Sequence, residues 1–463
     1  MKKMKLFDLA WPIFIETALF MLLGFIDVFI LSQYNDIAAS SINTANQAIS
    51  IATLVFTVIS GASAVLISQY LGAGKKKSAS RIAALSITFN LLFGVIVSLI
   101  FVLFSDSILA MIGASGDVMI YASQYLSIVG GSIFMQALLN AMAVIVRNHG
   151  LTKITMYMSF GMNVVNALLD SILVLGLFGM PRLGVAGVAI ATVFSRTVGT
   201  IVLTLFLFRK VESFSIFRMI IPFPKRDILN IIKIGVPSAL ETFLYNLSQL
   251  VLTSIVLIYL TDTELITKTY VQNITMFFYL FSVAVGQASQ IITGHYVGAG
   301  KYDEAYRQGL RGYLYALAIS LTVCVIGIIF RYQLLGIFTS DTEIINLGAS
   351  VIIINIILEF GRTTNLVLIA CLRGAGDVYF PTICAIFSMW LISVLGTYIF
   401  AVLFGLGIYG LWIGITADEI FRGIFMIIRW KRGKWRNKSI VKKQDRSGYE
   451  KEPDKLIIQE ESV

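Results

Sequence analysis

QYLGAGK, at residues 69–75, returns in the second half of the chain as HYVGAGK at residues 295–301. Each copy ends an apolar run, and its Gly-Ala-Gly is typical of a helix C-terminus, where glycine adopts the left-handed conformation at little cost. The glycines match neither Walker nor GxGxxG spacing, so a phosphate-binding loop is not indicated. Two copies this far apart in a chain of 463 residues predict two halves with one architecture.

Other pairs of segments are separated by nearly the same distance along the chain. Each half holds six apolar runs, an even number, so both halves are expected to enter a membrane in the same direction. We therefore expect two lobes related by a pseudo-two-fold axis along the membrane normal. The paired segments are Trp11–Glu16 with Val236–Glu241, Arg147–Gly150 with Arg373–Gly376, and Leu183–Gly187 with Leu406–Gly410.

The composition excludes most classes of soluble protein. Apolar side chains make up 57% of the chain and charged side chains 13%. Soluble domains average about 45–50% and about 25%, respectively. Disordered chains, secreted disulfide scaffolds and ordinary soluble enzymes lack this balance. The composition predicts a protein that lies in a lipid bilayer.

Twelve apolar windows are long enough to cross a hydrocarbon core of about 30 Å. The expected fold is an all-α membrane protein with twelve transmembrane helices in two six-helix lobes. Pro12 and Pro237 are expected near the starts of helices 1 and 7, where a missing N–H costs little. The windows are 9–32, 44–70, 82–104, 119–146, 154–179, 184–208, 228–260, 270–297, 309–330, 344–371, 378–404 and 407–430.

The windows and the basic segments between them predict the domain organisation. The N-terminal lobe is expected at 1–208, with helices 1–6, and the C-terminal lobe at 228–430, with helices 7–12. A cytoplasmic linker is expected at 209–227. The polar segment 431–463, poor in aromatic residues, is expected to be a solvated cytoplasmic tail.

Lysine and arginine placement predicts the orientation. Thirty of these residues fall in the N-terminus, the C-terminal tail and the loops on their side, and the opposite loops hold only Arg182, Lys268 and Arg331. Cytoplasmic loops carry the excess of positive charge. Both termini are therefore expected in the cytoplasm. The basic N-terminus precedes a run with no small-residue cleavage site, so the run is taken as the first helix of a multi-pass inner or plasma membrane protein.

Cysteine and histidine usage argues against metal sites, disulfides and intramembrane catalysis. Cys324, Cys371 and Cys384 lie inside apolar runs, and His149 and His295 are far apart at the predicted cytoplasmic edge. An intramembrane protease or acyltransferase would need a histidine at membrane depth. No enzyme activity and no cofactor are expected. The basic residues are scattered between apolar runs, so nucleic acid is not an expected partner either.

Besides Lys233, Arg311 and Arg429, which lie toward the cytoplasmic ends of their windows, ten charged residues lie inside the apolar windows. A charge at mid-bilayer costs about 2.5–3.5 kcal/mol even on insertion scales, so such residues normally face the bundle interior and mark ion or substrate pathways. Seven of the ten are acidic, which favours a cationic cargo. They are Glu16, Asp27, Asp170, Arg196, Glu241, Glu359, Arg362, Asp418, Glu419 and Arg422.

Asp27 and Asp170 are the strongest candidates for a cation site. Helices 1 and 5 run in the same direction. From the helical rise per residue, both acids are expected about 22–24 Å from the cytoplasmic starts of these helices, with Asn166 one turn below Asp170. Two carboxylates at one depth can form an oxygen cage for a cation, or can share one proton. The alternative is that they only satisfy helix–helix hydrogen bonds. Neither acid recurs in the second half, where Leu252 and Gly396 take their places.

The second half carries the candidate substrate-binding residues Glu241, Tyr245, Glu359 and Arg362. Glu359 and Arg362 are three residues apart and are expected to pair on one helix. The pair is either structural or faces a substrate. Glu16 and Glu241 are repeated with the scaffold, so a structural role is equally open for them. Tyr245, with other aromatic residues of this half, can contact an organic cation through its ring face, although packing is the commoner role.

The sequence resembles the multidrug and toxic compound extrusion (MATE) family over roughly residues 8–430. The motifs that carry the resemblance are GFIDVFILSQY at 24–34, SQYLGAGK at 68–75 with its repeat GHYVGAGK at 294–301, RNHG at 147–150, CLRGAGD at 371–377, and NALLDSILVLGLFGMPRLGVAGVAIAT at 166–192.

The resemblance implies a secondary antiporter, in which inward Na⁺ or H⁺ drives export of organic, mostly cationic and amphiphilic compounds by alternating access of two lobes. In the prokaryotic branch the first-lobe cation site falls on Asp27, Asn166, Asp170 and Thr192. Members with a second-lobe site use acids near the places of Glu241 and Glu359. The expected partners are small organic cations and the lipid bilayer, with the protein as a monomer. The alternative within the same superfamily is a lipid-linked saccharide flippase.

Overall fold

The computed structural model describes residues 4–32 and 35–441. The part of the predicted tail at 442–463 lies outside the described residues. The first half contains α1 Leu6–Ser32, α2 Asp36–Gly72, α3 Lys76–Ile112, α4 Gly116–Tyr125, η1 Leu126–Gly130, α5 Ile133–Asn148, α6 Thr152–Leu175, η2 Leu177–Gly179 and α7 Val185–Lys210. The short helix η3 Phe214–Ile220 follows in the predicted linker.

The second half repeats this pattern. It contains α8 Lys225–Tyr259, α9 Asp262–Gly298, α10 Tyr302–Ile329, α11 Arg331–Gly336, α12 Thr342–Gly374, α13 Tyr379–Ser388, η4 Met389–Val394, α14 Leu395–Thr397, η5 Tyr398–Leu403, α15 Gly407–Lys431 and η6 Lys434–Asn437. We call α1–α7 the N-lobe and α8–α15 the C-lobe. The predicted linker at 209–227 covers the last two residues of α7, η3 and the first three residues of α8.

The twelve predicted spans correspond to twelve helical rods. By length and composition, nine helices of the described residues can cross a membrane, or ten if the pair bent by 47° at α4–η1 and α5 counts as one span. The rods α1 and α15 complete the set, and α15 carries Asp418, Glu419 and Arg422 at its centre. Within window 119–146 the span contains a π-helical turn at η1 and bends after it. Hydropathy reveals neither feature.

Two proline positions differ from expectation. Pro12 and Pro237 lie inside α1 and α8, because these helices begin at Leu6 and Lys225, ahead of the apolar windows. An apolar window marks only the part of a helix that matches hydrocarbon, and the helix continues beyond it. The glycine prediction is confirmed: Gly74 and Gly300 have φ values of +76° and +74°.

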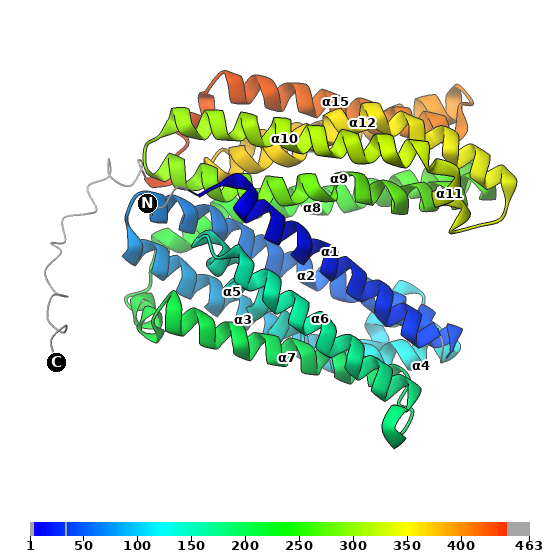
Figure 1. Cartoon of the computed structure of the whole chain (residues 1–463), viewed down its shortest axis with the longest axis horizontal. Helices are drawn as coiled ribbons and strands as arrows, with labels where there is room; N and C mark the ends of the chain where they lie inside the picture. Colours follow the sequence, from blue (N-terminus) through cyan, green and yellow to red (C-terminus); the bar gives the residue numbers. More distant parts are fainter. Residues whose placement is uncertain (1–3, 33–34, 442–463) are drawn as a thin grey trace, which may run out of the picture.

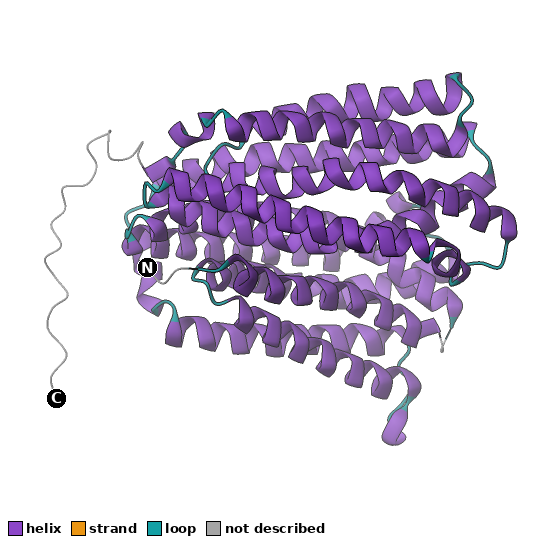
Figure 2. Ribbon diagram, turned by 45° about the horizontal axis from the view of Figure 1, so that its top comes forward, coloured by secondary structure: helices purple, strands orange, loops and turns teal. Residues whose placement is uncertain are grey.

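The two lobes are assembled in the same way. In the N-lobe α1 packs on α6 and, across the lobe boundary, on α9. In the C-lobe α8 packs on α13 and, across the boundary, on α2. Figure 1 shows the two lobes side by side near the marked N-terminus and diverging toward the other end of the molecule. Figure 2 shows helices running side by side, with most loops gathered at their two ends.

The repeated heptapeptides meet each other where the lobes touch. A Cβ added to Gly72 would overlap the carbonyl oxygen of His295, and a Cβ added to Gly298 would overlap the carbonyl oxygen of Gln69. Only glycine allows two backbones to approach this closely. Because 69 and 72 match 295 and 298 in the repeat, the two contacts are related by the pseudo-two-fold axis. We call this region the closed end.

Two hydrogen bonds repeat the same symmetry at the closed end. Gln69 Nε2 donates to the carbonyl oxygen of Gly374 at 2.8 Å. His295 Nε2 lies 2.8 Å from the carbonyl oxygen of Asn148, and since a carbonyl only accepts, the histidine nitrogen is the donor. Positions 148 and 374 also match in the repeat. His295 is therefore a buried contact between the lobes.

The start of the predicted tail packs on both lobes. We call residues 434–441 the terminal segment. Its Trp435 is fully buried and stacks on Trp430 of α15, with ring centroids 4.4 Å apart. Further along, the backbone N–H of Ile440 donates to Gln69 Oε1 of α2 at 3.0 Å. The expectation that this stretch is solvated is wrong. Trp435 packs on Trp430, and the backbone of Ile440 bonds to Gln69 at the closed end.

Candidate functional site

Three helices of the N-lobe bring the predicted cation-site residues together. α1 supplies Asp27, α6 supplies Asn166 and Asp170, and α7 supplies Thr192. Asp27 is 8% exposed, Thr192 is 2% exposed, and Asn166 and Asp170 are fully buried. We call these four residues the acid-pair site. The depth argument from helix rise anticipated this meeting of α1 and α6, which pack against each other.

Asn166 lies between the two acids. With its amide nitrogen toward them, Nδ2 donates to Asp27 Oδ1 at 3.0 Å and to Asp170 Oδ2 at 3.2 Å, and its oxygen accepts from the Thr192 backbone N–H at 3.3 Å. With the amide turned over, its oxygen faces two carboxylate oxygens instead. The second arrangement gathers oxygen atoms only, which is the donor set that hard cations prefer.

The acid pair has unused acceptor capacity. Asp170 Oδ1 is buried and finds no hydrogen-bond partner in the described part of the chain. Asp27 Oδ1 and Asp170 Oδ2 both lie within hydrogen-bonding distance of the same Asn166 nitrogen, so the two carboxyl groups are close together. Two ionised carboxylates cannot bond to each other, whereas one shared proton would supply the missing donor. The site can therefore be completed by a proton or by a small cation.

Two neighbours of the acid pair were not among the predicted site residues. Tyr125, buried at the end of α4, interacts electrostatically with both acids. Arg196 lies on α7 one turn after Thr192, and its charge interacts with Asp27. Arg196 was recognised as a charge inside an apolar window, and its spacing from Thr192 was the available signal. Tyr125 gave no signal, because an aromatic residue in an apolar window is ordinary.

A polar cavity of about 300 Å³ lies inside the N-lobe. Thr192 and Arg196 line it next to the acid-pair site, and Glu16 and Arg147 also line it. Glu16 Oε1 pairs with Arg147 Nη1 at 3.3 Å. Thr155 Oγ1 donates to Glu16 Oε2 at 2.8 Å. The charges of Glu16 and Arg147 are thus compensated locally.

The C-lobe repeats this arrangement around the candidate substrate residue Glu241. Glu241 Oε2 lies 2.7 Å from Arg373 Nη2 and accepts from Thr382 Oγ1 at 2.7 Å. In the repeat, these three residues occupy the positions of Glu16, Arg147 and Thr155, respectively. In this conformation the Glu241 carboxylate is engaged by partners of its own lobe.

Glu241→Gln is expected to lower the stability of the folded chain by about 1–2 kcal/mol, because a neutral amide still bonds to Thr382 but loses the charge-assisted bond to Arg373. The measurement is thermal unfolding of the purified chain in detergent. Glu304→Gln is the control, since Glu304 is exposed in the first turn of α10. Equal melting of Glu241→Gln and wild type would contradict the interpretation.

A second cavity, of about 360 Å³, lies between the lobes. Residues of α2, α5, α8, α9 and α12 line it, so both lobes contribute. Of the four candidate substrate residues, none lines either of the two cavities described here. Tyr245 is 45% exposed. Polar residues lining the second cavity include Thr57, Ser60, Asn140, Arg147, Ser238, Thr242, Gln287, Gln290 and Arg373.

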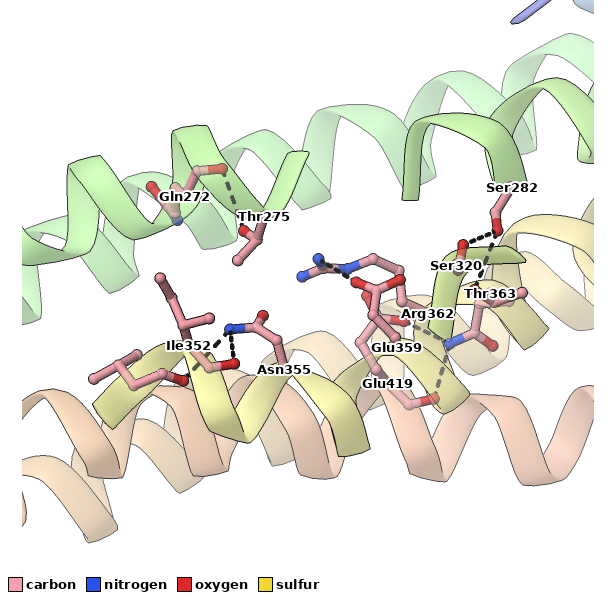
Figure 3. A network of polar contacts seen from close by, with 12 residues as sticks. Gln272, Thr275, Ser282, Ser320, Ile352, Asn355, Glu359, Arg362, Thr363 and Glu419 are labelled. Carbon is pink, nitrogen blue, oxygen red and sulfur yellow. Dashed lines mark hydrogen bonds and ion pairs between the residues drawn. The ribbon is translucent and has the colours of Figure 1, made fainter. Parts of the chain in front are cut away.

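Glu359 and Arg362 form the predicted ion pair on α12. Arg362 Nη1 lies 3.1 Å from Glu359 Oε1, and the guanidinium covers the ring of Tyr279 at 4.7 Å. Figure 3 shows Arg362 turned toward Glu359, with the hydroxyl groups of Ser282, Ser320 and Thr363 bonded to one another nearby. Glu359 is fully buried, and its Oε2 has no hydrogen-bond partner among the described residues.

A second charged cluster lies beside this pair on α15. Arg422 Nη2 lies 2.9 Å from Asp418 Oδ2 and 2.9 Å from Glu419 Oε1. Asn365 of α12 donates to Glu419 Oε2 at 2.6 Å, which ties α15 to α12. Both clusters of the C-lobe are thus internally paired. The acid pair of the N-lobe, by contrast, has no ion-pair partner within the described residues.

Comparisons with known proteins identify the family. The MatE family model matches residues 12–172 and 237–399, one match in each half. The chain is 38% identical over 440 residues to the uncharacterized transporter YisQ of Bacillus subtilis, covering 95% of this chain and 96% of that one. It is 27% identical over 440 residues to the probable multidrug resistance protein NorM of Thermotoga maritima, covering 95% and 94%.

Solved structures have the same fold. A crystal structure of MATE in the straight conformation aligns with a TM-score of 0.85 at 22% identity, over 94% of this chain and 96% of that one. An outward-facing multidrug resistance MATE transporter of the MOP superfamily aligns with a TM-score of 0.84 at 22% identity, over 93% and 96%. These likenesses support the twelve-helix, two-lobe layout. Together with the family match, they show that the chain belongs to the MatE family of multi-pass membrane transporters, which are not enzymes.

Proposed function

We propose that the chain is a secondary active antiporter. It exports organic, mostly cationic and amphiphilic compounds in exchange for inward Na⁺ or H⁺. The observation that carries the proposal is the acid-pair site: two buried carboxylates without an ion-pair partner in the described part of the chain, bridged by the Asn166 amide. Two unpaired charges at membrane depth are costly unless a cation joins them. No cofactor takes part besides the coupling ion.

The closed end supports alternating access. The lobes touch through Gly72, Gly298, Gln69 and His295, and a cavity of about 360 Å³ lies between them. With the basic loops in the cytoplasm, the closed end faces inward, and this conformation opens outward. Cation binding at the acid-pair site would then favour repacking of α1 and release of the substrate. We propose a location in the cell membrane, with both termini inside and the chain acting as a monomer.

The charges at membrane depth favour a cationic cargo. A lipid-linked saccharide flippase would expose positive charge in its central cavity. Arg147 and Arg373 do line the cavity between the lobes, but each is paired with a glutamate, Glu16 or Glu241. The name of the Thermotoga maritima relative, a probable multidrug resistance protein, agrees with drug export. We retain Glu241, Tyr245, Glu359 and Arg362 as proposed substrate-binding residues for the other conformations of the cycle.

Asp27→Asn tests this function. Everted vesicles that carry the full chain are loaded by ethidium uptake, with either a pH gradient or a Na⁺ gradient imposed alone. We expect one gradient to drive wild-type transport, and Asp27→Asn to reduce that transport to the level of vesicles without the protein. Asp8→Asn, an exposed acid on the same helix, is the control and is expected to retain transport. Undiminished gradient-driven transport by Asp27→Asn would refute the mechanism.

A further inference from the structure

We propose that Arg196 is a built-in counter-charge of the acid-pair site. Because of its charge, the site binds one monovalent cation in each transport cycle. The inference deepens the proposed function and rests on it, because it assumes that a cation couples at Asp27 and Asp170. It assigns Arg196 a role as a positioning residue that acts through the two acids.

The placement of Arg196 is the first support. It lies one turn after Thr192 on α7, and its side chain lines the N-lobe cavity next to the acid-pair site. Nη1 is buried and has no hydrogen-bond partner in the described part of the chain. The main-chain oxygen of Arg196 accepts from Thr200 Oγ1 at 2.8 Å, which is an ordinary contact within the helix. The guanidinium is therefore near the acids without being tied to them.

The charges around the site give the second support. Asp27 and Asp170 contribute two negative charges and Arg196 one positive charge. Tyr125 carries a phenol, which is uncharged at neutral pH. Arginine does not lose its proton in proteins, so its charge is permanent. Glu16 and Arg147, the other charged residues lining the N-lobe cavity, compensate each other at 3.3 Å. The net charge of the site is −1, and a single Na⁺ or H⁺ makes it neutral.

The Arg196 guanidinium also provides the acid-pair site with an opposite charge when no coupling ion is bound. When the coupling ion leaves, the guanidinium can reach from the cavity toward Asp27, because arginine carries its charge on a long, flexible stem. When an external cation returns, it displaces the guanidinium into the polar cavity. The buried acids are thus never left with two uncompensated charges, the situation that a low-dielectric interior penalises most. In this conformation the guanidinium lies on the cavity side.

Counting cations per transported substrate tests the proposal. The purified full chain is placed in proteoliposomes, and the ethidium gradient at which net flux reverses is measured against an imposed pH gradient or Na⁺ gradient. Relative to wild type, Asp170→Asn is expected to lower the count by one and Arg196→Gln to raise it by one. The double variant Asp170→Asn with Arg196→Gln is expected to return to the wild-type count. Arg196→Lys, which keeps the charge, is expected to leave the count unchanged.

The outcomes separate the two proposals. If wild type responds to neither gradient, the proposed antiport fails, and this inference fails with it. If wild type is coupled but the double variant does not return to the wild-type count, the counter-charge role of Arg196 is overturned and the antiport stands. Arg196→Met serves as a second neutral variant where Arg196→Gln does not fold. Should both neutral variants show the wild-type count, Arg196 only fills space, and the proposal is wrong.

Discussion

Replacing Gly298 by valine is expected to abolish transport while each lobe remains folded. Gly298 ends α9 with an ordinary helical backbone, so valine is not excluded there by its own conformation. The obstacle is the neighbour: the new Cβ would overlap the Gln69 carbonyl oxygen, which belongs to the backbone of α2 in the other lobe. Backbone atoms of a packed helix cannot move aside as a flexible side chain can. The lobes must separate at the closed end, which removes one of the two states that alternating access needs.

Ethidium transport in vesicles and thermal unfolding in detergent check this prediction together. Transport is expected to fall to background, with a change in melting temperature of only a few degrees. Gly336→Val is the matched control, because Gly336 also ends a helix, α11, and a Cβ there meets nothing within 4 Å. Gly72→Val, the symmetry-related change, is expected to behave like Gly298→Val. Wild-type transport by either variant would show that the lobes do not need this close contact.

Among the substitutions proposed for this chain, Trp435→Ala is expected to lower the free energy of unfolding most, by about 3–5 kcal/mol. Trp435 is fully buried, stacks on Trp430 with ring planes 10° apart, and donates its Nε1–H to the Trp430 carbonyl oxygen at 3.0 Å. Removal of the indole leaves a cavity against α15 and frees the terminal segment that reaches Gln69. The measurement is thermal unfolding of the purified full chain in detergent.

Two further variants separate packing from general loss of a tryptophan. Trp11→Ala removes an indole that is 45% exposed, and it is expected to change the melting temperature little. Trp435→Phe keeps most of the apolar contact and loses one hydrogen bond, so its effect should lie between wild type and Trp435→Ala. If Trp435→Ala melts at the wild-type temperature, the terminal segment does not contribute to the stability of the closed end.

The fold was largely predictable because the two features that determine it can be recognised in short stretches of the sequence. Hydropathy marks each rod, and the paired heptapeptides at 69–75 and 295–301 show that one half repeats the other. The bend after η1 was not predictable, because a π-helical turn has the same apolar composition as the helix around it. The packing of the terminal segment was also missed. Its composition is mostly polar, and its buried residues are only Trp435, Ser439 and Val441.

The candidate site was predictable only in part, for a different reason. Asp27 and Asp170 could be placed at one depth from helix rise alone, because α1 and α6 run in the same direction. The role of their surroundings depends on helix rotation and on which helices are neighbours, and the sequence does not state these. Arg196 and Tyr125 therefore entered the site only through the structure. In the same way, Glu241 could be recognised as repeated, but its partners Arg373 and Thr382 could not be identified.

The closed end also constrains how the two halves can change over time. The two copies of the heptapeptide are in backbone contact with each other. The residue at position 72 or 298 must therefore fit against the backbone of the other copy as well as into its own helix. Such positions cannot drift independently after a gene duplication. A chimera that joins one half of this chain to the opposite half of a distant relative would inherit two mismatched surfaces at its centre, even though each half alone is sound.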